Sequence, residues 1–199
     1  AVAESGRTEV DAQGAGLAPG VIDTHTPYDA QLSWDWTASP SPALGVTTVV
    51  IGNCGFGIVP APPASRERIL SDLAEVEGMP LESLKAGVTW SFEGFGEYLD
   101  TLRERGVYPN VAALASHTTI RAAVLGDESA TRPATGEELE RITGLFREAM
   151  DAGAVGLGSS TNENHRGTGG VPIGSRLAEV EEFQALANVL SEYDHGVFM

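Results

Sequence analysis

The chain has 199 residues, a length that suits one domain or part of a larger one and is sufficient to bury a core. Hydrophobic residues make up 42% and charged residues 20% of it, as in globular proteins and unlike disordered ones. The formal net charge is −16, and a field of that sign repels phosphate backbones and anionic lipid. Nucleic acids and membrane surfaces are therefore poor candidate partners, whereas a small-molecule substrate remains open.

Cys54 is the single cysteine, so no internal disulfide can form and a reducing compartment is expected. No stretch is long and apolar enough to span a bilayer. Residues 1–6 carry neither the basic nor the apolar region of a secretory signal. These features together predict a cytoplasmic location.

Short apolar segments predict five strands along the chain. The clearest is GVTTVVI, which is β-branched, apolar and bounded by Gly at both ends. Residues 21–25 are expected to form a short buried strand. In chain order, the expected strands cover residues 21–25, 45–51, 110–114, 153–157 and 196–199, the last only beginning.

Helical spacing of apolar residues alternates with these strands. Ser65 is a candidate N-cap for the first expected helix, and Thr135 with Glu138 forms a capping box ahead of a long apolar stripe. The expected helices cover residues 65–77, 92–105, 135–150 and 178–190.

Strands alternating with amphipathic helices are typical of a parallel α/β architecture. Five strands do not close an eight-stranded barrel, so a barrel would be partial. An open doubly wound sheet is the competing topology. It usually carries a Gly-rich phosphate-binding loop after its first strand, and no such loop occurs here.

The first polar cluster, DTHTPYD at residues 23–29, leaves the first expected strand at the end where α/β barrels gather their active-site groups. His25 at this strand end is a candidate metal ligand through a neutral ring nitrogen, and Asp29 lies in the same segment. The alternative for a single histidine is a structural or surface role.

The second cluster, GNCGFG at residues 52–57, follows the second expected strand. Glycines on both sides let the backbone approach a bound group, and a thiolate at Cys54 is a soft ligand suited to zinc. The alternative is that Cys54 is a small buried hydrophobic residue.

Together, HTPYD, GVTTVVIGNCGFGIVP and NVAALASHTTIRAAVLG resemble the N-acyl-D-amino-acid deacylases, or D-aminoacylases, of the amidohydrolase superfamily. The resemblance extends to LAPGVIDTH and GAVGLGSS, so it spans nearly the whole chain. GNCGF directly after GVTTVV is its most specific part. The His-bearing first segment is shared more widely in the superfamily.

The resemblance implies a partial metal-dependent (β/α)8 TIM-like barrel over residues 19–199, about its first five strands. Residues 1–18 would be the remnant of a small N-terminal β-sandwich. It also implies zinc-dependent hydrolysis of the amide bond of N-acyl-D-amino acids. His25 then matches the first histidine of the family's His-x-His pair, and Cys54 matches its metal-ligating cysteine.

Two departures from the family pattern affect this expectation. Pro27 stands where the pair has its second histidine, and proline has no atom that can bind a metal. The family's other histidine ligands and its catalytic aspartate lie on later strands, beyond Met199. The chain by itself is therefore expected to be an inactive portion of the enzyme and to bind zinc weakly or not at all.

Further polar residues follow the third and fourth expected strands. His117 and Arg121 are candidates to line the substrate cleft, with Arg121 able to pair with a carboxylate through two hydrogen bonds. Asn162, just before the Gly-rich segment NHRGTGG, and His165 and Arg166 within it are candidates to contact the substrate. Structural hydrogen bonds and surface salt bridges are the alternatives for all five residues.

Two other functions remain open from the sequence. A hydantoinase-like amidohydrolase would use a carboxylated lysine on the fourth strand, but the one lysine, Lys85, lies far from GAVGLGSS. A non-catalytic barrel fragment or binding module that has lost its metal is favoured by Pro27. An incomplete barrel would also expose sheet edges, which predicts self-association of the isolated chain and low stability.

Overall fold

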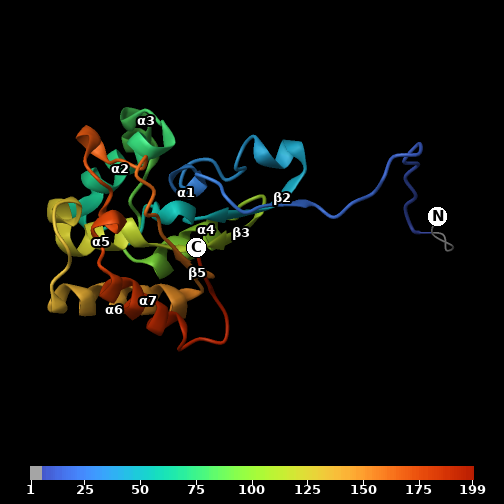
Figure 1. The fold of residues 1–199 in the computed structure, drawn as a ribbon. Coiled ribbons are helices and arrows are strands. Elements are labelled where there is room, and N and C mark those ends of the chain that lie inside the picture. The colour runs from blue at the N-terminus through green and yellow to red at the C-terminus, as the bar shows by residue number, and fades with distance from the viewer. Residues whose placement is uncertain (1–5) are drawn as a thin grey trace.

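The computed structural model describes residues 6–199, which contain a parallel sheet with helices packed against it (Figure 1). The strands are β1 (Val21–Asp23), β2 (Val46–Ile51), β3 (Asn110–Ala113), β4 (Ala115–Ser116), β5 (Gly156–Gly158) and β6 (Val197–Phe198). The α-helices are α1 (Tyr28–Gln31), α2 (Arg66–Glu77), α3 (Leu81–Gly87), α4 (Phe95–Arg105), α5 (His117–Leu125), α6 (Gly136–Ala152) and α7 (Val180–Leu190).

The strands pair in chain order and all pairs are parallel, in the orders β1-β2-β3 and β4-β5-β6. The two groups join, since the Val155 amide donates to the Ala113 carbonyl at 2.9 Å and only Leu114 separates β3 from β4. β3 thus corresponds to the strand expected at residues 110–114, and β4 lies just beyond that range. The order shows no reversal of the kind that marks a doubly wound sheet.

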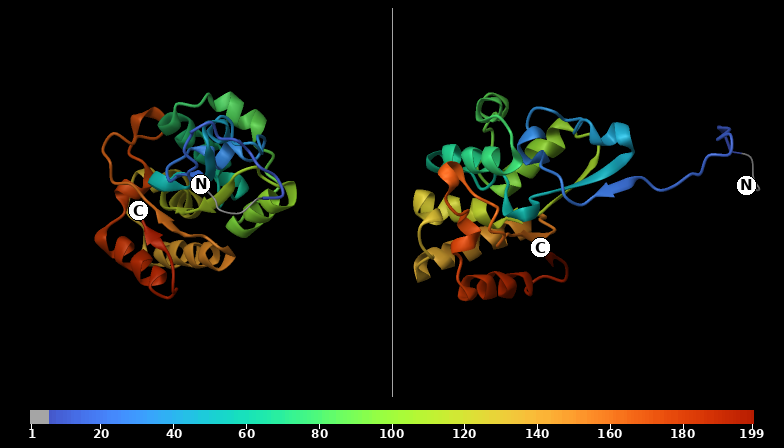
Figure 2. Two further views of the ribbon diagram at one scale, coloured as in Figure 1. Left: turned by 90° about the vertical axis from the view of Figure 1, so that its right-hand side faces the viewer. Right: turned by 45° about the horizontal axis from the view of Figure 1, so that its top comes forward.

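The helices that connect successive strands lie side by side, α4 against α6 and α6 against α7 (Figures 1 and 2). Their inward faces form one core with the sheet. Tyr98 of α4, Phe146 of α6 and Leu186 of α7 are each at most 1% exposed, as is Leu157 of β5. The expected alternation of strands and amphipathic helices is confirmed.

The capping box that begins α6 is present as expected. The Glu138 amide donates to the Thr135 hydroxyl at 3.4 Å, and the Thr135 amide donates to the Glu138 carboxylate at 2.8 Å. Ser65 occupies the N-cap position of α2, but its hydroxyl does not cap the helix. It donates instead to the Ala122 carbonyl at 3.0 Å, because α5 packs against this end of α2.

The first strand differs from its expectation in length and in burial. β1 ends at Asp23, so His25 lies outside it, and Val21 and Ile22 are 55% and 62% exposed. The reason is its position, since β1 is an edge strand with β2 as its one partner. An apolar β-branched pair was therefore a poor signal of burial here.

Three helices were not expected from the sequence. α1 and α3 are short, and α5 begins with HTTI, whose residues have low helix propensity. The fourth expected strand is also shifted, from residues 153–157 to β5. Gly153 ends α6 in a left-handed conformation with φ of 109°, which leaves it unavailable to the strand.

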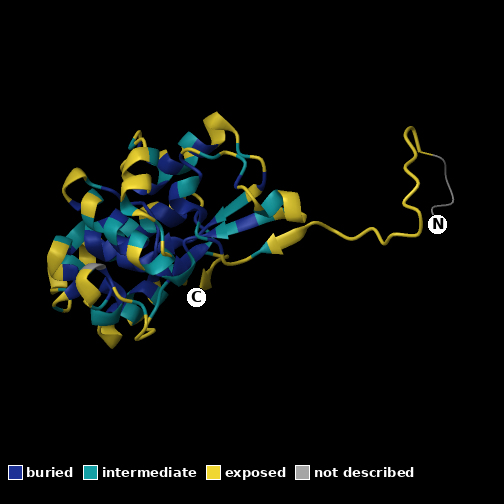
Figure 3. Ribbon diagram, turned by 90° about the horizontal axis from the view of Figure 1, so that it is seen from above, coloured by how far each residue is buried: buried dark blue, intermediate teal, exposed yellow. Residues whose placement is uncertain are grey.

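Residues 6–20 contain no helix or strand and extend away from the body of the molecule (Figure 3). The expected β-sandwich remnant at residues 1–18 therefore has no strand in its described part, and residues 1–5 of it lie outside the described residues. Within residues 6–199, every helix is too short or too polar to cross a membrane.

Candidate metal-binding site

His25 and Cys54 meet at the carboxyl ends of two neighbouring strands. His25 follows β1 by two residues, and Cys54 follows β2 by three. Because β1 and β2 are parallel neighbours, the segments that leave them emerge at the same edge of the sheet. The Cys54 Sγ atom lies 2.8 Å from the His25 Nε2 atom. The two candidate ligands, 29 residues apart in sequence, are in hydrogen-bond contact.

Hydrogen bonds to backbone carbonyls hold the two segments together. The Thr26 amide and hydroxyl both donate to the Val50 carbonyl, at 3.1 and 2.8 Å. The Asn53 side-chain amide donates to the Thr24 carbonyl at 2.8 Å. These bonds flank the contact between His25 and Cys54 and fix the spacing of the two segments.

The backbone at Cys54 is strained. Its φ is 62°, in the left-handed region that a residue with a side chain adopts at a cost of roughly 1–3 kcal/mol. Gly52 before it has a φ of 78°, and a Cβ added there would lie 2.2 Å from the Leu114 carbonyl oxygen. Glycine is therefore required at position 52. At position 54 a cysteine occupies a backbone conformation that favours glycine. Strain of this kind clusters at functional sites.

The thiol of Cys54 is held in its neutral form. Burial raises the pKa of this thiol, and the nearby carboxylate of Glu77 raises it further. Burial also raises the pKa of the Glu77 carboxyl, and the electrostatic attraction of His25 opposes this effect. A thiol and an imidazole ring can share a hydrogen bond, which accounts for the contact with His25. A bound divalent cation would reverse this preference, since a coordinating thiol is deprotonated.

Asp29 lies buried beneath the two segments. Its side chain accepts the Gly52 amide at 3.2 Å, and its backbone carbonyl accepts the Tyr98 hydroxyl at 2.7 Å. Burial raises the pKa of the Asp29 carboxyl to about 7, although the hydrogen bond from Gly52 acts in the opposite direction. The residue thus links α1 to the start of the Cys54 segment.

His165 is the third histidine at this edge of the sheet. Its Nδ1 atom lies 2.7 Å from the Ser160 hydroxyl, and its ring meets that of Phe56 edge-on at 5.7 Å. Burial lowers the pKa of His165, and electrostatic repulsion from His25 lowers it further. His165 therefore packs against Phe56, two residues after Cys54.

Asn162 and Arg166 lie in the same segment as His165 and are exposed. The Asn162 side chain accepts the Asn164 amide at 2.9 Å, and the Arg166 guanidinium donates to the Gly170 carbonyl at 3.0 Å. Both side chains stabilise their own loop and remain open to solvent. Their contact with a substrate stays a prediction.

His117 and Arg121 belong to a separate, fully buried cluster. His117 Nε2 lies 2.7 Å from the Glu182 carboxylate, and its Nδ1 lies 2.8 Å from the Ser159 hydroxyl. The Arg121 guanidinium pairs with the same Glu182 carboxylate and donates to the Arg132 carbonyl at 3.0 Å. Both side chains are 0% exposed. Burial lowers the pKa of His117, against the effect of Glu182.

Glu182 was not singled out in the sequence, although a signal was present. It shares a helical face with Leu186 and Val189, and all three are buried in α7. A carboxylate on the apolar face of a helix predicts a buried cationic partner. Asn53 forms hydrogen bonds to both segments of the site, but no pattern in the sequence indicated this role.

His25 and Cys54 fit a zinc ion in kind but not in number. A neutral imidazole and a thiolate are common zinc donors, and a structural site has four ligands. No group of three or more His, Cys, Asp or Glu residues able to hold a metal occurs within the described part of the chain. The 2.8 Å separation of Sγ and Nε2 is also shorter than the ~3.5 Å that tetrahedral zinc bond lengths imply.

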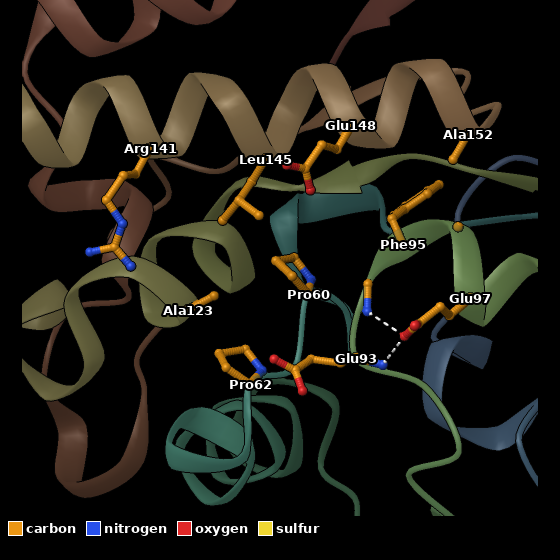
Figure 4. A pocket seen from close by; sticks show the side chains of 12 residues that line it. Pro60, Pro62, Glu93, Phe95, Glu97, Ala123, Arg141, Leu145, Glu148 and Ala152 are labelled. Carbon is orange, nitrogen blue, oxygen red and sulfur yellow. Dashed lines mark hydrogen bonds between the residues drawn. The ribbon is translucent and has the colours of Figure 1, made fainter.

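A cavity of about 620 Å³ lies elsewhere, between α4, α5, α6 and the segment at Pro60 and Pro62 (Figure 4). None of the candidate site residues lines it. The Glu97 carboxylate at its edge accepts the amides of Glu93 and Gly94, at 2.7 and 3.1 Å, and so caps α4. Nothing in the cavity connects it with His25 or Cys54.

Known proteins match this chain over most of its length. The model of the amidohydrolase family matches residues 8–198. D-aminoacylase from Alcaligenes xylosoxydans xylosoxydans is 40% identical over 154 residues, which cover 75% of this chain and 28% of that protein. N-acyl-D-aspartate deacylase from the same organism is 38% identical over 152 residues, which cover 76% and 28%.

Solved structures give the same result. A D-aminoacylase crystal structure, said to define a novel subset of amidohydrolases, matches with a TM-score of 0.67 at 30% identity and covers 90% of this chain and 33% of its own. N-acyl-D-glutamate deacylase from Bordetella bronchiseptica, solved with zinc and a phosphonate inhibitor, matches with a TM-score of 0.64 at 27% identity and the same coverage. The chain thus spans about a third of these relatives. It belongs to the amidohydrolase family, and its relatives there are D-aminoacylases and N-acyl-D-amino-acid deacylases.

Proposed function

We propose that this chain carries the first part of the active site of a zinc-dependent N-acyl-D-amino-acid deacylase, which hydrolyses an amide bond. The observation that carries the proposal is the 2.8 Å contact of Cys54 Sγ with His25 Nε2 at the carboxyl ends of β1 and β2. Relatives named as deacylases of N-acyl-D-amino acids support the substrate class. The zinc bound to one of them supports the choice of metal.

In this proposal His25 donates Nε2 and Cys54 donates its thiolate to the metal. When bound, zinc polarises a carbonyl and lowers the pKa of a water molecule, which is the chemistry that amide hydrolysis needs. The chain's own contribution is to hold the two donors in contact through the bonds of Thr26 and Asn53. Glu77, within electrostatic range of both donors, would help to balance the charge of the metal.

Substrate contacts are proposed for the exposed segment that follows β5. Asn162 and Arg166 keep open polar groups there, and His165 packs against Phe56 of the Cys54 segment. An arginine is suited to the carboxylate of an N-acyl amino acid. His117 and Arg121 also remain candidates, but their polar atoms already bond to Glu182, so the substrate would have to compete with that pairing.

We further propose that residues 19–199 form about the first five strands of a (β/α)8 barrel and that residues 1–18 belong to a β-sandwich. The sequential order of parallel strands supports the barrel. Two donors cannot complete a zinc site, so the chain alone should be inactive. A cytoplasmic location is proposed from the single cysteine.

A second candidate function is a non-catalytic module that has kept the fold and lost the metal. Pro27 favours it, since this residue lies two positions after His25 and cannot bind a metal. The module would self-associate through the exposed edge strands, where Val21 and Val197 are 55% and 48% exposed. Sedimentation of the chain as a stable monomer would count against this association.

The decisive experiment uses the protein translated from the complete reading frame around this chain. Histidine-bearing strands are expected to follow Met199, and the protein should hydrolyse N-acetyl-D-amino acids and spare the L-enantiomers. The chain by itself should hydrolyse neither. Turnover by the isolated chain would contradict the proposed incompleteness. Absence of turnover by the complete protein, when loaded with zinc, would favour the non-catalytic module.

A further inference from the structure

We propose that Asn53 is a positioning residue, which locks Cys54 in its left-handed conformation and sets its Sγ atom against His25. The inference rests on the proposed function, because it assigns Asn53 the task of assembling the two metal donors. It concerns the side chain between Gly52 and Cys54, and it makes a prediction about the metal-free protein.

The nitrogen and the oxygen of the Asn53 side-chain amide make different hydrogen bonds. The Nδ2 group donates to the Thr24 carbonyl at 2.8 Å, on the residue directly before His25. The Oδ1 atom accepts the Cys54 backbone amide, also at 2.8 Å. One planar group therefore touches the segments that carry both candidate donors, and it needs a donor on one side and an acceptor on the other. The side-chain amide of asparagine supplies both, on two separate atoms.

The second bond also explains how the strained backbone at Cys54 persists. An unfavourable φ survives where the surrounding contacts determine it. The Cys54 amide is fixed by Asn53, and the residue after it is fixed from the other side, since a Cβ added to Gly55 would lie 2.9 Å from the Ser159 Cα. Cys54 is thus held by the Asn53 side chain on one side and by the close approach of Gly55 to Ser159, at the end of β5, on the other.

The consequence is a defined direction for the thiol. Cys54 is half-buried, and His25 is exposed on a segment that ends β1. Without the Asn53 bridge, the His25 segment would keep its bonds from Thr26 to Val50, but the Cys54 amide would lose its hydrogen bond to the Asn53 side chain. The thiol would then leave the imidazole and reach solvent more often.

The test compares Asn53→Ala, which loses both bonds, with Asn53→Asp, which keeps the acceptor and loses the donor. Thr24→Ala is the control, because it removes a side chain and keeps the carbonyl that Asn53 contacts. Cys54 is the only thiol of the chain, so the rate of alkylation by iodoacetamide reports on it alone. The nuclear Overhauser contact between the Cys54 β-protons and the His25 ring reports on the geometry.

We expect alkylation to be several-fold faster in Asn53→Ala and the Overhauser contact to be lost. Asn53→Asp should lie between it and the parent, and Thr24→Ala should match the parent. An unchanged rate and contact in Asn53→Asp, with an unchanged circular dichroism spectrum, would overturn the inference even if Asn53→Ala did not fold. Both measurements are made without metal, so their outcome does not depend on whether the complete protein is a deacylase.

Discussion

Two polar clusters lie at the same edge of the sheet, and they differ in how far their side chains are exposed to solvent. In the first, Cys54 and His25 are partly open to solvent and contact each other. In the second, His117 and Arg121 are 0% exposed and share the Glu182 carboxylate. The same residue types thus serve two purposes. A cluster that is closed to solvent and held by a shared carboxylate stabilises the fold, whereas one that is open to solvent can bind a ligand.

The largest expected effect is on the buried cluster. Glu182→Ala would leave the Arg121 charge and the His117 ring without their shared partner, at a cost of about 3–5 kcal/mol in the free energy of unfolding. Chemical denaturation measures this cost. Glu181→Ala, at the exposed neighbouring position, is the matched control and should stay within about 0.5 kcal/mol of the parent. Equal effects at the two positions would show that the buried cluster is not structural.

A smaller effect, with a distinct pH dependence, is expected at Asp29 beneath the first cluster. Its pKa is about 7 when folded and near 3.8 when unfolded, so the folded state binds the extra proton between these values. Stability from this group is fully present below pH 3.8 and is lost as the pH rises to 7, by up to about 4 kcal/mol.

Asp29→Asn should remove this slope, since the amide stays neutral and still accepts the Gly52 amide. Denaturation across this pH range measures it. Asp100→Asn, exposed on α4, should keep the slope of the parent. If Asp29→Asn kept that slope as well, the pH dependence would belong to other groups.

The smallest expected effect concerns the strain at Cys54. Both Cys54→Gly and Cys54→Ala remove the thiol, but only glycine adopts a φ of 62° without strain. Cys54→Gly should therefore be the more stable of the two, by about 1 kcal/mol. Thermal unfolding of the pair, which needs no comparison with the parent, measures the difference. A more stable alanine variant would mean that the backbone is not strained in solution.

The fold was predictable where local chemistry decided it. The capping box of Thr135 and Glu138 and the β-branched run of β2 each acted through neighbours in sequence, and both were confirmed. Position in the sheet was not predictable, since the exposure of Val21 depends on which strand is at the edge. The α5 helix also begins at residues of low helix propensity, because packing against α2 and α6 outweighs that propensity.

The candidate site, like the fold, has one part that was predictable from the sequence and one that was not. His25 and Cys54 were identifiable because each follows a strand of one parallel sheet, and the structure brings them together. The burial and pairing of His117 and Arg121 were not predictable. They depend on Glu182, which lies in a helix more than sixty residues further along the chain. A sequence shows which groups are available for chemistry, but burial and long-range pairing decide which of them are left free.

The central claim is that His25 and Cys54 are two donors of an incomplete zinc site. Titration of the chain with zinc in competition with a chromophoric chelator tests it most directly, with Cys54→Ser as the comparison. The account predicts weak binding, well short of the roughly 10 kcal/mol of a complete structural site, and weaker still without the thiol. Tight binding of one equivalent, or binding that Cys54→Ser leaves unchanged, would contradict it.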